Sequence, residues 1–278
     1  MRRRVGIVGF GQLGQYLAAE VQRRPESLEL AFVWSRGRVL HGLPPHLVLE
    51  DLAQAASRRP DLVVEVAHPS LVRLHGEQLL RHCDLLVGSP TAFAEPDTEG
   101  RLRAAATRHG LFVPCGALWG LHDIRALADR GQLAELTVTM TKHPSALRLA
   151  DAEMRVRCDR AAAAGGAAVT LYDGPVRDLC PLAPNNVNSM AAAAMAAHTL
   201  GFDGVRGRLV ADPCMADYHS LELDLVGPSE PDGRTFRVRT LRMNPADRAA
   251  VTASATYGAF LGSMLEAAKG HGPGLHFC

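Results

Sequence analysis

The sequence has no long apolar run, few aromatic residues and no excess of charge of either sign. Aromatic residues make up 5% of the 278 positions, and 30 basic residues stand against 29 acidic ones. Binding to a nucleic-acid backbone needs a basic excess, so this balance argues against a nucleic-acid partner. No apolar run reaches the roughly 18 to 20 residues that span a bilayer. We therefore expect a cytoplasmic protein that binds neither nucleic acid nor membrane.

The six cysteines are widely spaced. The nearest pair, Cys158 and Cys180, lies 22 positions apart. Zinc sites and redox pairs usually place two ligands two to four positions apart, so the spacing predicts no metal site. A disulfide framework is also unexpected in a chain of this length without a secretory signal. We expect most of the cysteines to be small core residues.

Short β-rich segments alternate with helical ones in the first part of the chain. The apolar run Leu62–Ala67 is of the kind that is buried on both faces of a parallel sheet. The alternation predicts an α/β fold with a Rossmann-type, doubly wound parallel sheet. Strands are expected at 5–8, 28–34, 62–67, 85–88 and 111–114, and helices at 12–23, 75–82 and 98–108.

After Leu118 the pattern changes to strands that alternate in polarity, as half-exposed strands do. It predicts a second, α+β domain with an open mixed or antiparallel sheet. We expect residues 1–120 to bind a dinucleotide, 121–241 to bind substrate and form a dimer, and 242–278 to return a helix to the first domain. Strands are expected at 136–143, 168–172, 220–226 and 235–241, helices at 121–128, 188–200 and 252–269, and a flexible loop at 161–168.

A G-x-G-x-x-G motif directly follows the first expected strand and opens a helix. Its residues are Gly9, Phe10, Gly11, Gln12, Leu13 and Gly14. The first glycine permits a tight turn, the second lets the backbone approach a pyrophosphate, and the third allows close packing of helix on strand. The helix N-terminus adds N–H groups and a partial positive charge. The motif therefore predicts a dinucleotide site.

The residues after the second strand bear on the choice between NAD and NADP. An acidic residue there would bind the ribose 2′-hydroxyl, whereas an arginine suits a 2′-phosphate. The chain has Ser35 and Arg36 at this point, followed by Arg38, and no acid. We expect NADP, or both cofactors, to be used. An ordinary solvated loop is the alternative, above all for Arg38.

Two further segments follow later parallel strands, at the edge where open α/β sheets bind ligands. One is Ala67-His68-Pro69 and the other is Ser89-Pro90-Thr91. We expect Ala67, His68, Pro69 and Pro90 to line the nicotinamide half of the cofactor site. A catalytic role for His68 is the less favoured alternative.

Three polar segments stand out in the second half of the chain. They are Pro184–Asn188, Ala211–Pro213 and the single residue His219. Each has a simple explanation by itself, as a helix cap, a turn and a strand-edge histidine. Together and in this order they resemble the L-aspartate dehydrogenase family. The resemblance extends to the glycine motif, Val63–Ala67 (VVEVA), Pro114–Asp123 and Asn244-Pro245.

The chain departs from the family's pattern in four places. Cys115 replaces a serine, His122 is inserted before Asp123, and no acid stands near Ser35. In addition, Ala-Asp-Tyr precedes His219 where bacterial members tend to have Arg-Asn-Val. The departures at Cys115, His122 and His219 bear on substrate geometry and rate, and the missing acid bears on NAD preference.

The resemblance implies cofactor contacts at Ala117 and Asn188 and an active-site role for His219. The implied reaction oxidises L-aspartate through iminoaspartate to oxaloacetate and ammonia, or runs in reverse, and in bacteria its product can feed NAD biosynthesis. Two alternatives stay open. One is a catalytically weak or inactive NAD(P)-binding regulatory protein. The other is an oxidoreductase that resembles homoserine dehydrogenase or dihydrodipicolinate reductase, which share this two-domain plan.

The chemistry of this reaction calls for a residue that moves protons. The substrate amine must be neutral before the hydride leaves, and the attacking water must lose a proton. An imidazole with a pKa near neutrality serves both steps and contributes about 10²- to 10⁴-fold in rate, so we expect His219 to be the general acid/base. For the two substrate carboxylates, Lys142, His143 and Asn186 are candidates, although Lys142 is equally well explained as a solvated strand end. An exposed apolar sheet face in the second domain would favour a homodimer.

Overall fold

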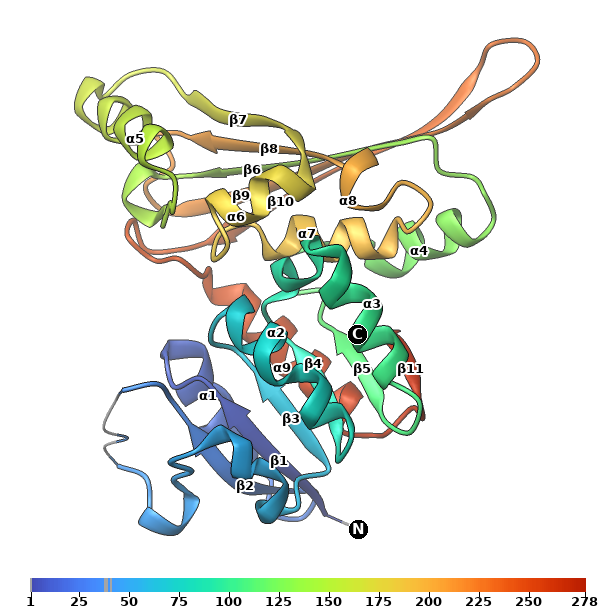
Figure 1. Cartoon of the computed structure of the whole chain (residues 1–278). Helices are drawn as coiled ribbons and strands as arrows, with labels where there is room; N and C mark the ends of the chain where they lie inside the picture. Colours follow the sequence, from blue (N-terminus) through green and yellow to red (C-terminus); the bar gives the residue numbers. More distant parts are fainter. Residues whose placement is uncertain (1, 38–39, 41) are drawn as a thin grey trace. The chain divides into compact units, whose positions relative to one another are not determined.

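The computed structural model of the chain describes residues 2–37, 40 and 42–278. It divides the chain into two compact units, Met1–Pro114 with Phe260–Cys278, and Cys115–Ala259 (Figure 1). Arg38, one of the arginines considered for the cofactor, lies outside the described residues. No helix in the described part of the chain combines the length and apolar character that crossing a membrane requires.

The first unit is built on a six-stranded sheet in the order β11-β5-β4-β3-β1-β2, and every pair of neighbours in it is parallel. This confirms the doubly wound parallel sheet that the sequence predicts. The strands are β1 (Arg3–Val8), β2 (Leu28–Trp34), β3 (Leu62–Glu65), β4 (Asp84–Val87), β5 (Gly110–Val113) and β11 (Gly274–Phe277), and the helices are α1 (Gln12–Gln22), α2 (Pro69–Leu80) and α3 (Pro96–Ala105). Helix α9 (Ser254–Ala267) begins in the second unit and belongs to the first from Phe260 onward.

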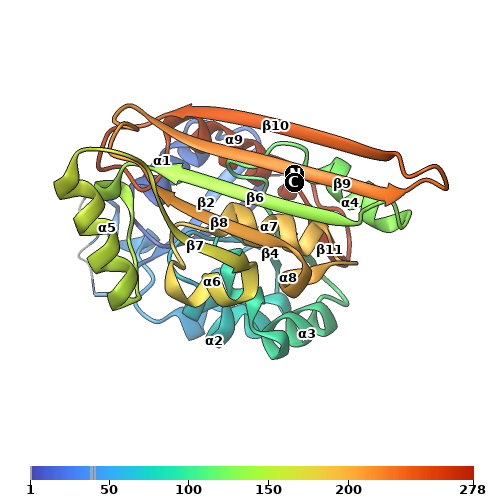
Figure 2. The same cartoon turned by 90° about the horizontal axis from the view of Figure 1, so that it is seen from above.

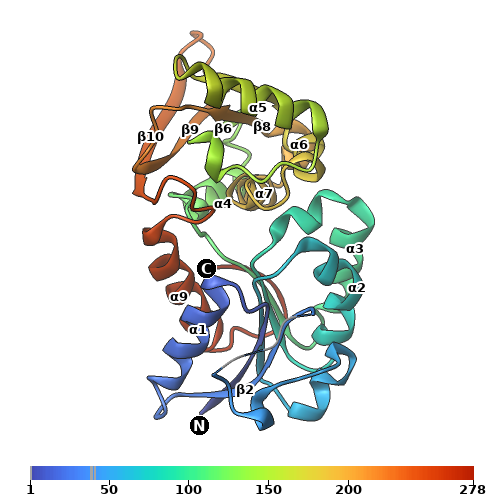
Figure 3. The ribbon, with the colours of Figure 1, turned by 90° about the vertical axis from the view of Figure 1, so that its left-hand side faces the viewer.

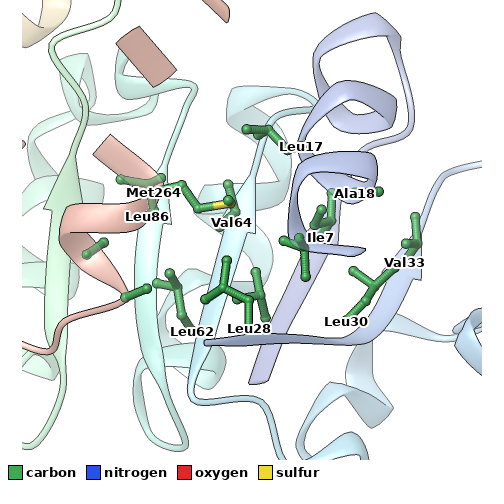
Figure 4. Packing of buried hydrophobic residues seen from close by; sticks show 14 of the residues in the cluster. Ile7, Leu17, Ala18, Leu28, Leu30, Val33, Leu62, Val64, Leu86 and Met264 are labelled. Carbon is green, nitrogen blue, oxygen red and sulfur yellow. The ribbon is translucent and has the colours of Figure 1, made fainter. Parts of the chain in front are cut away.

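Helices cover both faces of this sheet: α1 and α9 lie on one face, and α2 and α3 lie on the other (Figure 3). Between the sheet and the first pair of helices, Ile7 and Val64 from the strands pack with Leu17 of α1 and Met264 of α9 (Figure 4). All four side chains are almost completely buried. This core fixes the carboxyl ends of β1 and β3, where the glycine motif and the Ala67 segment begin.

The second unit contains a five-stranded mixed sheet in the order β10-β9-β6-β8-β7 (Figure 2). Only β6 and β8 are parallel, and the remaining neighbours are antiparallel. The mixed sheet of the expected second domain is thereby confirmed. Its strands are β6 (Glu135–Lys142), β7 (Val169–Pro175), β8 (Arg206–Ala211), β9 (Tyr218–Ser229) and β10 (Thr235–Pro245), and its helices are α4 (Leu121–Asp129), α5 (Ala152–Ala164), α6 (Val176–Leu182), α7 (Asn188–Ala196) and α8 (Gly201–Gly204).

Two expectations about local structure are wrong. The 161–168 run is not a loop throughout, because its first four alanines form the last turn of α5. Asp151 caps this helix by accepting a hydrogen bond from the Met154 N–H (2.8 Å), and Gly165 ends it at φ +58°. The helix expected over 188–200 ends at Ala196.

Candidate active site

The three glycines of the motif occupy three different environments. Gly9 has φ +112°, a conformation that favours glycine. A Cβ atom on Gly14 would lie 2.0 Å from the carbonyl oxygen of Gly9, so the helix can approach the strand only because this side chain is absent. Gly11, the N-cap residue of α1, has no neighbouring atom within 4 Å of a Cβ position. The open space beside Gly11 lets a pyrophosphate group approach the protein backbone, so the motif suits a dinucleotide.

The remaining residues of the motif support this turn. Gln12 begins α1, whose N-terminus has no side-chain cap. Phe10 and Leu13 are partly buried and pack against the core of the first unit. The turn is thus held by apolar contacts on one side and is open on the side of Gly11.

Positive charge gathers where β2 ends and α2 begins. Arg36 is exposed, and its Nη2 lies 3.4 Å from the hydroxyl of Ser70, in the first turn of α2. Ser35, directly before it, is half-buried. Burial lowers the pKa of His68, and the charges of Arg36 and Arg73 lower it further. An anionic group bound here would meet two cations and the amino end of a helix.

The segment after β3 uses its histidine as a helix cap. His68 Nδ1 accepts a hydrogen bond from the Ser70 N–H (3.2 Å) and lies 2.8 Å from the Ser70 hydroxyl. Pro69 then supplies the first residue of α2, a position that suits proline. Pro90 starts the short 3-10 helix Pro90–Ala94 in the same way. The imidazole is therefore engaged in holding the backbone of this segment.

One residue at this edge of the sheet was not anticipated as functional. Glu65, the last residue of β3, is 2% exposed and accepts hydrogen bonds from the backbone of Ala67, His68 and Ser89. The sequence signal is an acid inside an otherwise apolar strand. Its partner Ser89 lies 24 positions away, on the far side of another strand and helix, so the contact is not visible in the sequence.

In the second unit, three buried polar residues form a row across three adjacent strands. His219 of β9 pairs with Asn244 of β10. On its other side Ser220 pairs with Thr141 of β6, which places Lys142 opposite His219. Lys142 is 4% exposed and His219 is 7% exposed. The alternative explanation of Lys142 as a solvated strand end is therefore wrong.

The same dry environment shifts the pKa values of both basic groups. Burial, followed by the charge of Arg148, lowers the pKa of Lys142 from 10.5 to about 7. Burial, followed by the charge of Lys142, lowers the pKa of His219 to about 4, against a hydrogen bond with the Ala250 backbone that raises it. The His219 Nε2 atom is buried and has no hydrogen-bond partner among the described residues. This differs from the near-neutral imidazole expected from the sequence.

Lys142 has a sequence signal that was overlooked. It is one of only two lysines in the chain, the other being Lys269. A lysine can release its proton when it is buried, whereas an arginine keeps its charge. The choice of lysine at this strand end, in a chain whose other basic residues are nearly all arginine or histidine, favours a site where the side chain can lose its proton.

The loop after β10 is tied to these strand ends. Each of the four residues 248–251 has a backbone hydrogen bond with a polar side chain from the site. The Arg248 carbonyl accepts from Ser145 Oγ (2.7 Å). The Ala249 carbonyl accepts from Arg148 Nη2 (3.5 Å). The Ala250 backbone is hydrogen-bonded to the His219 imidazole, and the Val251 carbonyl accepts from Lys142 Nζ (2.8 Å). The loop therefore holds both Lys142 and His219 in place. The Ala211–Pro213 turn joins the same region, because the Asp212 N–H donates to the Lys142 carbonyl (2.9 Å).

His143 and Asn186 are buried but are engaged with the protein itself. Arg248 Nε donates to His143 Nε2 (2.9 Å), and His143 Nδ1 lies 2.7 Å from the Ser145 hydroxyl. Asn186 Oδ1 accepts from the Arg148 N–H (2.7 Å), and its Nδ2 donates to the Ala146 carbonyl (3.2 Å). Both side chains hold the 144–148 segment next to Lys142.

Of the two expected cofactor contacts in the second unit, Ala117 lies on a turn and Asn188 lies at the start of a helix. The Ala117 carbonyl accepts a hydrogen bond from Arg242 Nη1 of β10 (3.1 Å). Asn188 is half-buried and begins α7, directly after Val187 at the N-cap. No group of three or more histidine, cysteine, aspartate or glutamate side chains in the described residues is arranged to hold a metal ion.

Comparisons with known proteins agree with this division of the chain. Residues 9–114 match a family described as "Homoserine dehydrogenase, NAD binding domain", and residues 123–263 match one described as "Aspartate dehydrogenase, C-terminal". An "Aspartate dehydrogenase domain-containing protein" from Xenopus tropicalis is 48% identical, over 100% of this chain and 98% of its own length. The chain belongs to the aspartate dehydrogenase family.

More distant members support the same family assignment. "L-aspartate dehydrogenase 2" from Bordetella bronchiseptica is 31% identical over 77% of this chain and 79% of its own length. The crystal structure of aspartate dehydrogenase from Thermotoga maritima superposes with a TM-score of 0.67 at 19% identity, covering 97% of this chain and 96% of that one. At that identity the likeness shows the fold. The aspartate dehydrogenase family is one of oxidoreductases, and the first unit of this member matches an NAD-binding domain.

Proposed function

We propose that this aspartate dehydrogenase family member oxidises L-aspartate with NAD(P), through iminoaspartate, to oxaloacetate and ammonia, or catalyses the reverse. The observation that carries the proposal is the buried His219 imidazole, whose Nε2 has no hydrogen-bond partner among the described residues and which stands beside Lys142. A buried polar atom without a partner is costly unless a ligand completes it. The family match of the second unit supports L-aspartate as that ligand.

The proposed roles follow from the protonation states. With a pKa of about 4, His219 is neutral at working pH, so its Nε2 can accept a proton from the substrate ammonium. Once it has released that proton to solvent, it can accept another from the attacking water. Lys142 can pair with one substrate carboxylate, whose negative charge favours the protonated form of the lysine, and backbone N–H groups at the start of α7 are candidates for the other carboxylate. The nicotinamide cofactor supplies the acceptor for the hydride that leaves C2. Asn186 and His143 would act by holding the segment beside Lys142.

We further propose that NADP, or both NADP and NAD, is used. Arg36 and Ser35 supply a cation and a hydroxyl after β2, where the ribose of the adenosine half binds in this fold. The Gly9–Gly14 turn would hold the pyrophosphate, and Ala67–Pro69, Pro90, Ala117 and Asn188 would line the nicotinamide half.

We also propose that the protein is a cytoplasmic homodimer. None of the six cysteines, all of which lie among the described residues, forms a disulfide bond, as is usual in reducing compartments. On β10, Leu241 is 62% exposed and Met243 is 45% exposed, so this strand presents apolar surface that a second copy would cover. Light scattering on the purified protein measures the oligomeric state directly.

The test of the reaction is a spectrophotometric assay of the full-length protein with NAD and NADP side by side. L-aspartate should give reduced cofactor at alkaline pH, and D-aspartate, L-glutamate and L-homoserine should not. His219→Ala should lower kcat by about 10²-fold or more, with cofactor binding intact. A folded wild type that binds cofactor but oxidises none of these amino acids would instead support a regulatory NAD(P)-binding protein. The low pKa of His219 is the observation that favours this second candidate.

A further inference from the structure

Glu65 is a buried acid that the proposed reaction does not use. It ends β3 at the carboxyl edge of the parallel sheet, 2% exposed, in a strand whose other residues are apolar. Acidic side chains are rarely buried to this extent unless they are paired. No basic side chain within the described residues forms an ion pair with it, so its stabilisation comes from hydrogen-bond donors.

The donors come from two separate loops. Oε1 accepts hydrogen bonds from the N–H groups of Ala67 (2.7 Å) and His68 (2.8 Å) and from the Ser89 hydroxyl (3.1 Å). Oε2 accepts one from the Ser89 N–H (3.0 Å). A carboxylate offers only acceptors, so one side chain satisfies donors from the loop after β3 and from the loop after β4 at the same time.

Both loops also pack closely against their neighbours. A Cβ atom on Gly9 would lie 2.8 Å from the Val66 carbonyl and 2.9 Å from the Ala67 Cβ, so the first loop rests directly on the glycine turn. A Cβ atom on Gly88 would lie 2.4 Å from the Glu65 carbonyl, and the Gly88 N–H donates to that carbonyl at 2.8 Å. The glycine turn and both loops therefore meet around Glu65.

We propose that Glu65 is a positioning residue for the nicotinamide cofactor: its carboxylate joins the loops after β3 and β4 beneath the glycine turn and so sets cofactor affinity. The inference rests on the proposed cofactor site but not on the proposed reaction. Glu65 acts through the backbone of Ala67, His68 and Ser89 and not by direct contact with the cofactor.

This arrangement makes cofactor affinity depend on pH. Burial raises the pKa of Glu65 to about 7, against the hydrogen bonds from Ala67, His68 and Ser89 that lower it. Protonation of the Glu65 carboxylate turns one of its accepting oxygens into an O–H donor, which then faces another donor. One of the hydrogen bonds that link the two loops is therefore lost. The imidazole of His68, the titratable side chain on the adjoining loop, is turned to Ser70, and its pKa is lowered from 6.5. Affinity should therefore increase from pH 6 to pH 8, as Glu65 loses its proton.

The experiment measures the dissociation constant of NADPH and of NADH by fluorescence titration between pH 6 and pH 8.5, together with thermal unfolding. Glu65→Gln keeps the shape but turns an amide N–H₂ toward the backbone donors. It should weaken binding by about tenfold or more and remove the increase with pH. The matched control is Asp84→Asn, at the amino end of β4. Asp84 is also buried, accepts from the Gly110 N–H (2.8 Å) and pairs with Arg3, so its loss should lower the unfolding temperature but leave affinity and its pH dependence unchanged.

The proposal is overturned if the Glu65→Gln variant binds the cofactor as tightly as the wild type does, or if its affinity keeps the same pH dependence. If this variant does not fold, Ser89→Ala removes one donor and leaves the other three hydrogen bonds. It should weaken binding about three- to tenfold, and unchanged affinity counts against the inference. A wild type that binds the cofactor but does not oxidise L-aspartate overturns the proposed reaction alone. A wild type that binds no nicotinamide cofactor overturns both.

Discussion

Substituting the second glycine of the motif separates the cofactor's requirements from those of the fold. Gly11→Ala places a methyl group where no atom lies within 4 Å, at a residue with φ −73° that any amino acid adopts. Alanine reduces the entropy of the unfolded chain, which stabilises by about 0.4–1 kcal/mol. It is a poorer N-cap than glycine, which costs a similar amount. The two effects nearly cancel, so the unfolding temperature should change by about 2 °C or less.

The same methyl group stands where a pyrophosphate would approach the backbone, so the affinity for NADPH should fall by about tenfold or more. Gly14→Ala is the contrasting variant. Its Cβ would lie 2.0 Å from the Gly9 carbonyl oxygen, which belongs to rigid backbone, so α1 must move away from β1. This substitution should lower both stability and affinity.

Calorimetric titration with NADPH and thermal unfolding of the apoprotein, run on both variants, check these expectations. Gly11→Ala protein that unfolds at the wild-type temperature and binds NADPH with wild-type affinity would show that the cofactor does not approach Gly11. A large loss of apoprotein stability in Gly11→Ala would show that the space beside this residue is not open.

Two further predictions concern charge. Because the pKa of Lys142 is about 7 in the folded protein and near 10.5 when unfolded, the unfolded chain binds the extra proton between these values, and stability should rise with pH across this window by about 4–5 kcal/mol. Urea unfolding from pH 7 to pH 10 should show that rise in the wild type and in Lys269→Met, which changes an exposed lysine and serves as the control. Lys142→Met should show a much smaller rise. If the free energy of unfolding has the same slope against pH in all three proteins, the burial argument is refuted. Arg36→Ala should raise the KM for NADP by about 5- to 20-fold without changing that for NAD, while Arg81→Ala, at the other end of α2, should change neither. An Arg36→Ala variant with an unchanged ratio of the two KM values would place the 2′-phosphate elsewhere.

Local patterns in the sequence were sufficient to predict most of the fold. The glycine motif and the apolar strand Leu62–Ala67 identify the first sheet, because short-range signals determine a tight turn and a strand buried on both faces. Strand β11 was not predicted, since its four residues follow a glycine- and proline-rich stretch and it is held by its pairing with β5. Helix α5 was missed because its charged residues form no apolar stripe, although Asp151 caps it.

The candidate site was harder to predict from the sequence, because its contacts join residues that are distant in the chain. Glu65 meets Ser89 only when β3 and β4 pair side by side. Lys142 and His219 are brought opposite one another by the register of β6 with β9, two strands that lie far apart in the chain. The residue types could be singled out in the sequence, but their juxtaposition could not.

The protonation states of Lys142 and His219 follow from burial, which the sequence does not reveal. An imidazole is the usual choice for a group that titrates near neutrality, and on that ground His219 was expected to do so. Loss of solvent is the largest cause of both pKa shifts and disfavours both cations, so the lysine reaches about 7 and the histidine falls to about 4. At neutral pH the group that changes charge in this row is therefore Lys142. His219 stays neutral there. In the proposed reaction its Nε2 can then accept a proton, and a protonated Lys142 would supply the positive charge for a substrate carboxylate.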